Sequence, residues 1–439
     1  MLHSINVKNT KIPFIFEENH DLPIIFFKLI FQNAGKAYEN AFESKVVKST
    51  TNSKPNSLTN TAKTSLSTKN SQKIPAGTAR LFARLLNEGA NERFFKDLEL
   101  YAINLNASSG FESFELSLSC LKEHFNFALK KLALLLKNPQ FDEKLLKRLK
   151  TTALGELASN QSDFDYVAKG LLNKTVFEYE EFATNNDGDE KSIEEISLDH
   201  LKEFHKKLLN LENACVVVGG DLLQKECEGL IYPILDALST GQRPNTKEFT
   251  LCEDLKDEIC IRKESEQAYI YFCSPFELDF KDEDAHLAKL AIFVLGAGGF
   301  GSRLMEEVRV KRGLAYSAYA MLDANLCYKR VFGYLQTKNE NASEAKALVK
   351  SLFADFVKKG VSQNELDQAQ RFLIGSTPLR YESLEKRLSV AYNEFYQGLQ
   401  IGAFKQELNK IKATSLKELN AYIKAHSELS SLSFASVAR

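Results

Sequence analysis

Three glycines in the second half of the sequence have the spacing of a phosphate-binding loop. Gly296, Gly298 and Gly301 match G-x-G-x-x-G, a pattern in which N–H groups of a loop and a following helix hold the pyrophosphate of a dinucleotide. Asp323 follows at about the distance at which such sites place an acid that binds ribose. The pattern therefore raises the hypothesis of a nucleotide-dependent enzyme.

The residues before these glycines must form a strand for that chemistry to work. The range 283–295 instead has the apolar spacing of a helix, with Leu287, Leu290 and Val294 on one face. A helix at this place provides no strand-to-helix turn for a phosphate. We therefore expect the glycines to follow a helix, which makes the dinucleotide hypothesis the weaker one.

The residues after the glycines carry a longer and more specific pattern. They read S-R-L-M-E-E-V-R-V-K-R-G-L-A-Y-S. This run resembles the C-terminal half of the pitrilysin/insulinase family of zinc peptidases, which includes the mitochondrial processing peptidase. In that family an arginine and a tyrosine seven residues later bind the substrate carbonyl beside the zinc, and the resemblance places them on Arg309 and Tyr316.

The chemistry of these two side chains suits that role. Arginine is a permanent cationic fork and tyrosine a neutral donor, so Arg309 and Tyr316 together could stabilise the oxyanion of a tetrahedral intermediate. The structural alternative is that Arg309 only solvates a helix and Tyr316 packs in the core. The resemblance also assigns substrate binding to the glycine-rich loop, at Gly298 and Gly299.

The zinc motif that the resemblance requires is replaced in this sequence. Active members carry an inverted H-x-x-E-H helix, and here Arg80, Ala83 and Arg84 stand at the positions of His, Glu and His. A guanidinium has no lone pair for a metal, and alanine cannot take a proton from water. Glu156 corresponds to the third ligand, and we expect it to pair with Arg80 or Arg84. The sequence predicts no metal and no cofactor in this chain.

The same resemblance identifies a sheet edge. Asn106 and Ala107 begin the segment N-A-S-S, which corresponds to the edge that receives peptide in active chains. Peptides add to such an edge through backbone hydrogen bonds, which tolerate varied sequences. In a chain without the zinc motif this role could be vestigial.

Other candidate ligands have simpler interpretations. Cys120 to His124 reads C-L-K-E-H, the spacing of an inverted zinc motif with cysteine in first place, but it lies where a strand gives way to a helix. We expect Glu123 and His124 to be a solvated helix start. His200 and His205 are five residues apart on a charged helix and are predicted to lie on the surface.

Composition limits the classes of function. The chain has 439 residues, 44% hydrophobic and 26% charged, which indicates two or three globular domains. Its net charge of -1 argues against nucleic acid or an acidic membrane surface as partner. Seven cysteines without a C-x-x-C indicate reduced thiols. The apolar range 22–31 contains Lys28 and predicts a buried strand, so we expect no membrane span and a cytoplasmic protein, or a periplasmic one if a leader was removed.

Internal repetition predicts two copies of one unit. I-S-L-D-H-L-K-E-F from Ile196 and I-K-A-T-S-L-K-E-L from Ile411 each precede a strand-like run. We predict an α+β fold of two homologous α/β-roll domains, each an antiparallel sheet with helices on one face, over residues 1–237 and 245–439. By resemblance the halves clasp a mostly polar cavity. The insert 44–73, rich in Ser, Thr, Asn and Lys, is predicted to be flexible.

These observations favour a subunit that works with a second chain. We expect a non-zinc subunit of a heteromeric processing metallopeptidase, in which Arg309 and Tyr316 reach a peptide or unfolded protein held by a zinc-bearing homologous partner. One alternative is a structural subunit without a proteolytic role, like the family members found as core subunits of a respiratory complex. Another is an enzyme that acts alone, with an unforeseen metal or through the glycine-rich loop.

Overall fold

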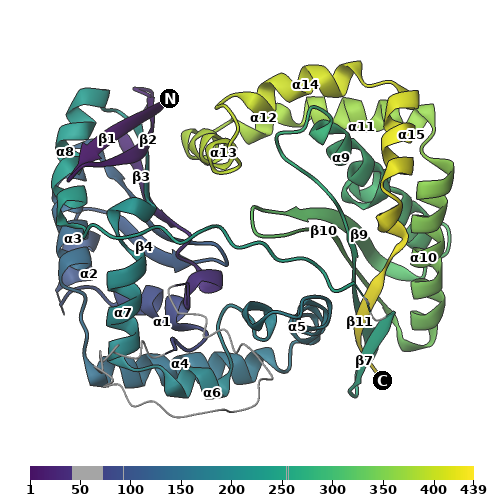
Figure 1. Cartoon of the computed structure of the whole chain (residues 1–439), viewed down its shortest axis with the longest axis horizontal. Coiled ribbons are helices and arrows are strands. Elements are labelled where there is room, and N and C mark those ends of the chain that lie inside the picture. Colours follow the sequence, from purple (N-terminus) through teal and green to yellow (C-terminus); the bar gives the residue numbers. More distant parts are fainter. Residues whose placement is uncertain (42–72, 92, 254, 256) are drawn as a thin grey trace, which may run out of the picture.

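The described chain forms two α+β units of similar design (Figure 1). The computed structural model describes residues 1–41, 73–91, 93–253, 255 and 257–439. Of the insert 44–73, all but Lys73 lies outside these residues, so its flexibility stays a prediction. The predicted fold class is confirmed, since each unit has its own sheet and its own helices.

The N-terminal unit is built on a six-stranded sheet. Its strands, in spatial order, are β1 (Leu2–Val7), β2 (Thr10–Glu18), β6 (Ala214–Gly220), β3 (Ile24–Gln32), β5 (Ser113–Leu121) and β4 (Asn104–Ser109). Buried side chains alternate along β5, as expected for a strand with one face on the core. The strand predicted within 22–31 is confirmed as β3, and β4 is the last strand at one edge.

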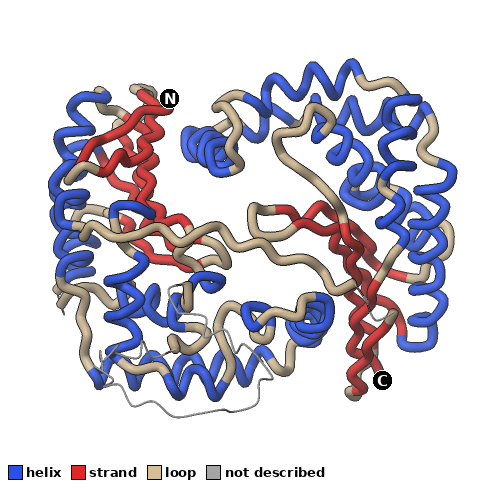
Figure 2. Tube along the Cα trace, viewed as in Figure 1, coloured by secondary structure: helices blue, strands red, loops and turns tan. Residues whose placement is uncertain are grey.

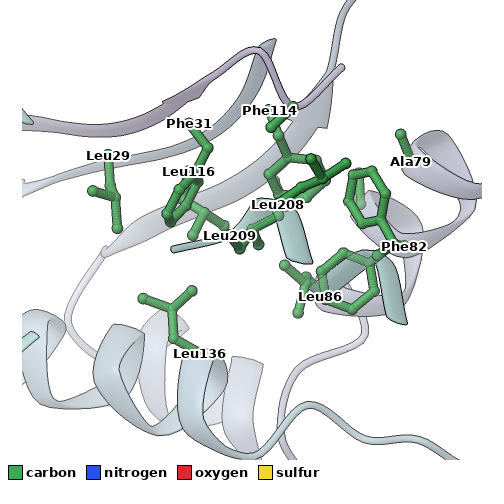
Figure 3. Close-up of a cluster of buried hydrophobic side chains, with 14 of the residues drawn as sticks. Leu29, Phe31, Ala79, Phe82, Leu86, Phe114, Leu116, Leu136, Leu208 and Leu209 are labelled. Atoms are coloured by element: carbon green, nitrogen blue, oxygen red, sulfur yellow. The ribbon is translucent and has the colours of Figure 1, made fainter. Parts of the chain in front are cut away.

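Helices cover one face of this sheet and enclose the larger core. They are α1 (Thr78–Leu86), α2 (Phe94–Glu99), α3 (Phe125–Lys137), α4 (Glu143–Asn160), α6 (Glu190–Glu195), α7 (Leu198–Leu208) and α8 (Gln224–Ala237). Figure 3 shows Phe82 of α1 beside Phe114 of the sheet, with ring centroids 5.8 Å apart. Because the apolar face of α1 is held by this core, its polar face points away from it, and that face carries Arg80 and Arg84.

The C-terminal unit repeats the plan with five strands. In spatial order they are β7 (Glu258–Arg262), β11 (Ser433–Ala438), β8 (Gln267–Pro275), β10 (Lys329–Lys338) and β9 (Ala315–Ala324). Its own helices are α9 (Ala285–Ile292), α10 (Ala342–Lys359), α11 (Gln363–Gly375), α12 (Thr377–Arg380), α14 (Ala403–Ala413) and α15 (Leu416–Ala425). Each sheet is antiparallel except for one pair, β2 with β6 and β7 with β11, where the chain returns after its helices.

Each unit also places one helix against the other unit's sheet. The helix α5 (Phe164–Val176) of the N-terminal unit packs on β8 and β11, and α13 (Leu384–Tyr396) of the C-terminal unit packs on β2 and β6. Arg387 of α13 forms an ion pair with Glu17 of β2 at 2.6 Å. Figure 2 shows the loop that follows α8 crossing from one unit to the other. The two units are therefore joined by helices from both sides as well as by the linker.

The glycine-rich segment continues a helix, which excludes the dinucleotide loop. α9 runs into a π-helical turn, η5 (Phe293–Ala297), before the single 3-10 turn η6 (Gly299–Gly301). A Cβ at Gly296 would lie 2.3 Å from the backbone nitrogen of Ala320, so glycine allows η5 to pack directly on β9. Asp323, the candidate ribose ligand, instead pairs with Arg330 at 2.9 Å. The dinucleotide hypothesis is wrong because α9 and η5, and not a strand, lead into the glycines.

Among the described helices, none is both long and apolar enough to cross a bilayer.

Candidate functional site

The face of α1 where the zinc motif would lie is occupied by ion pairs. Arg84 donates to Glu156 of α4 through both terminal nitrogens, one of these bonds measuring 2.9 Å between Nη1 and Oε1. The predicted pairing of Glu156 with an arginine of this helix is confirmed. Hydrogen bonding to Arg84 holds the pKa of Glu156 below its usual value, and the same contact raises the pKa of Arg84.

A second carboxylate completes this cluster. Asp187 Oδ1 lies 3.3 Å from Nε of Arg80 and 3.7 Å from Nη2 of Arg84. The turn that carries Asp187 is fixed by close backbone packing, because a Cβ at Gly77 would lie 2.6 Å from the Asp187 carbonyl oxygen. Two cations and two anions thus balance one another on this face. The two guanidinium groups have no lone pair for a metal, the two carboxylates are engaged by them, and the network has no net charge that would attract a cation.

Ala83, at the position of the catalytic base, is buried against the core. It cannot take a proton from a water molecule, and it presents no polar atom beyond its backbone. Within the described ranges, no group of three or more His, Cys, Asp or Glu side chains is placed to hold a metal ion. The α1 face can therefore position neighbouring elements, but its side chains cannot perform metal-assisted hydrolysis.

The buried acid Glu39 accepts a hydrogen bond at the start of α1. Glu39 accepts a hydrogen bond from the backbone N–H of Ala79 at 2.7 Å, at the N-terminal end of the helix where free N–H groups need acceptors. Burial raises the pKa of Glu39 to about 8. Nearby, Lys36 donates to the carbonyl oxygens of Glu181 and Thr184, and burial lowers its pKa to about 8. Glu39 thus anchors the start of α1, and Lys36 anchors the loop at 181–184.

Arg309 and Tyr316 lie together on the surface of the C-terminal unit. Arg309 is the last residue but one of the π-helical segment η7 (Met305–Val310), and Tyr316 is the second residue of β9. The guanidinium carbon lies 4.5 Å from the ring centroid of Tyr316 and 4.8 Å from that of Phe300 in the glycine-rich loop. Tyr316 is 80% exposed and Phe300 67%. The alternative that Tyr316 packs in the core is therefore wrong.

Arg309 has no carboxylate within ion-pair distance among the described residues. Its neighbour Glu307 is instead engaged by Lys311 at 2.7 Å and by Arg312 at 2.6 Å. Stacking on two aromatic rings orients the plane of the guanidinium while its N–H edge remains available. The pair thus combines an exposed phenol, Tyr316, with a half-buried guanidinium, Arg309, whose charge no carboxylate among the described residues neutralises.

The remaining candidate substrate residues lie on β4 and in the glycine-rich loop. Gly298 caps η5, and Gly299 adopts a left-handed conformation with φ of 58°. Asn106 and Ala107 lie on the edge strand β4, as the resemblance implies. The N–H of Ala107 donates to Oδ1 of Asn87 at 2.7 Å, and Nδ2 of Asn87 donates to the Ala107 carbonyl at 2.9 Å.

A cavity of about 450 Å³ lies between α5 with the loop at 184–187 on one side and strands β9 and β10 on the other. Asp187 and Lys169 line it from the N-terminal unit, and Met321, Asp323 and Arg330 line it from the C-terminal unit. Charged side chains therefore face this cavity from both units.

Two histidines differ from their predicted surface position. His200 is buried within the capping box of α7, and its Nδ1 accepts a hydrogen bond from the Ser197 backbone. The ring of His205 packs on Phe82 with centroids 5.4 Å apart, and burial lowers its pKa. The prediction was wrong because the charged residues beside these histidines suggested a solvent-exposed helix face.

His124 of the C-L-K-E-H segment packs on the ring of Tyr101, with ring centroids 4.7 Å apart.

Comparison with known proteins identifies the family of this chain. The family model described as Insulinase (Peptidase family M16) matches residues 67–186, and Peptidase M16 inactive domain matches residues 195–373. Over 435 residues the chain is 38% identical to the non-peptidase homolog YmxG of Helicobacter pylori, covering 98% of this chain and 93% of that protein. The chain belongs to the M16 peptidase family. It is an M16 member in which ion pairs replace the zinc ligands.

Solved M16-like structures share the fold along the whole chain. A structure described as peptidase M16 inactive domain from Pseudomonas fluorescens superposes with a TM-score of 0.82 at 24% identity, covering 100% of this chain and 98% of that one. A protease from Helicobacter pylori superposes with a TM-score of 0.80 at 15% identity, with both chains covered completely. At these identities the likeness concerns the fold alone.

Three residues of the site were missed by sequence reasoning about this M16 chain. Asp187 lies in a D-G turn, a signal that predicts the turn but not the helix that it contacts. Phe300 stands between Gly299 and Gly301, and no pattern in the sequence links its ring to Arg309. Asn87 follows the last residue of α1, and no pattern in the sequence links it to β4.

Proposed function

We propose that this chain is the non-zinc subunit of a heteromeric M16 processing peptidase. It contributes Arg309 and Tyr316 to the active site of a zinc-bearing homologue and encloses half of the peptide chamber. The observation that carries the proposal is a contrast between two regions of one chain. On α1 the charges of Arg80 and Arg84 are neutralised internally. Arg309, in contrast, is partly buried against two aromatic rings and has no carboxylate partner among the described residues.

The geometry of Arg309 and Tyr316 supports an action on a peptide that a second chain holds. Stacking between Phe300 and Tyr316 orients the guanidinium without consuming its hydrogen-bond donors. An arginine and a phenol that point outward can meet a developing oxyanion on a peptide that another chain holds.

The Helicobacter pylori matches offer a parallel to the proposed pairing. One protein of that organism is named a non-peptidase homolog and is 38% identical to this chain. A solved structure from the same organism is named a protease and shares the fold with a TM-score of 0.80. A heteromeric enzyme of the proposed kind consists of two chains of this fold, one that is a peptidase and one that is not.

Reconstitution tests the proposal. The purified chain is mixed with an M16 homologue that carries the H-x-x-E-H motif and zinc, and cleavage of an unfolded protein is followed. We expect a stable complex that cleaves, with one zinc per pair, and little cleavage by either chain alone. If the zinc-bearing homologue cleaves equally well without this chain and forms no complex with it, the proposed function is wrong and a structural role is the better account.

A further inference from the structure

One side chain closes the open edge of the N-terminal sheet at its centre. β4 is the last strand of that sheet, and in an antiparallel pair the N–H and C=O of every second residue point away from the neighbouring strand. Ala107 is such a residue, since both of its outward groups bond to the Asn87 side chain instead of β5. Ala107 is also only 5% exposed.

The Asn87 amide makes the same two hydrogen bonds to Ala107 that an added strand would make. It presents one acceptor and one donor, at 2.7 and 2.9 Å, to the N–H and C=O of a single residue. A peptide that extends the sheet at β4 needs the same two groups. The single N–H of Ala107 cannot serve both partners, so the amide and a peptide exclude each other at this position.

We propose that Asn87 is an internal competitor that keeps the β4 edge closed to extended peptides. The edge opens only when the Asn87 side chain rotates away from Ala107. Rotation requires no repacking of the core, because Asn87 is itself exposed and caps the C-terminal end of α1. This inference rests on the proposed function, in which the chain meets peptide, and it names the residue that controls one surface of the chamber.

The expected effect follows from the competition. A peptide that binds the native chain must first displace two hydrogen bonds, whereas in a variant without the amide the edge is free. Net hydrogen-bond contributions of this kind correspond to about a tenfold difference in affinity. Asn87→Leu should have a similar effect, because it keeps about the size of the side chain but offers Ala107 neither an acceptor nor a donor.

Fluorescence anisotropy on the full chain tests the competition without any partner. The probe is a fluorescein-labelled octapeptide of alternating threonine and valine with uncharged ends. Asn87→Ala should bind it about tenfold more tightly than the native chain. Asn138→Ala is the matched control, because Asn138 is also the exposed C-cap of a helix, α3, and lies in a different part of the chain. The control should bind as the native chain does.

Hydrogen exchange locates the binding. In Asn87→Ala the peptide should slow exchange in residues 104–109, and it should do so much less in the native chain. Equal affinity of the native chain and Asn87→Ala, or tighter binding without protection of 104–109, would overturn the inference. If Asn87→Ala fails to fold, Asn87→Leu takes its place, and an unchanged affinity of that variant has the same meaning. Because no cleavage is measured, the result is independent of whether Arg309 and Tyr316 act on substrate.

Discussion

Arg84 and Glu156 form a two-bonded ion pair between α1 and α4, at the positions where the resemblance places the second histidine and the third zinc ligand of an active chain. Glu156 stands at the position of the third zinc ligand, and here it binds Arg84, which stands at the position of a histidine ligand. Asp187 neutralises the remaining charge at 3.3 Å from Arg80. The former metal face has thus become a structural contact between two helices.

The first prediction concerns zinc. Because Arg80 and Arg84 offer no lone pairs and Glu156 is engaged, the purified chain should contain no stoichiometric zinc and cleave no peptide. Elemental analysis of protein dialysed against micromolar zinc measures the content. One zinc per chain that disappears in Glu156→Gln would contradict the account.

The second prediction concerns the pH dependence of the Arg84–Glu156 pair. The pKa of Glu156 is lowered in the folded chain, so its contribution is present above the unfolded pKa of about 4.3 and is lost as pH falls through the folded pKa. Glu156 is half exposed, so the pair should contribute less than about 1 kcal/mol. The melting temperature of Glu156→Gln should lie slightly below that of the native chain at pH 7 and match it near pH 2. A constant difference at both values would show that the effect is not electrostatic.

The third prediction concerns the buried acid under α1. The pKa of Glu39 is raised to about 8, so between roughly pH 4.3 and 8 the folded chain retains a proton that the unfolded chain releases. The free energy of unfolding should therefore fall as pH rises through this window. Glu39→Gln keeps an acceptor for the Ala79 N–H but does not titrate, so its stability should be flatter over the same range. Urea unfolding at pH 5 and pH 8 makes the comparison, and parallel curves for the two proteins would count against a protonated Glu39.

Much of the fold could be predicted from the sequence because its signals are local. The apolar spacing in 283–295 is enough to place a helix before the glycines, and repeated patterns near Ile196 and Ile411 are enough to suggest two units. The pairing of Glu156 with α1 also followed from charge, since two arginines on one helix face require acids nearby.

The parts that could not be predicted depend on contacts between distant segments. Asp187 reaches Arg80 only because its turn packs on the backbone at Gly77. The bond between Asn87 and Ala107 joins residues from a helix end and a sheet edge, which no periodicity connects. The exchange of α5 and α13 between the units likewise depends on tertiary packing.

The central claim is that Tyr316 acts in turnover, and removal of its hydroxyl group tests this claim. In the complex with the zinc-bearing homologue, Tyr316→Phe should leave folding and assembly intact and lower kcat roughly a hundredfold, because a donor aimed at an oxyanion acts mainly in the transition state. Tyr232→Phe, at another exposed tyrosine on α8, is the matched control and should leave kcat unchanged. A kcat for Tyr316→Phe within twofold of the native complex would contradict the account and leave this chain a scaffold.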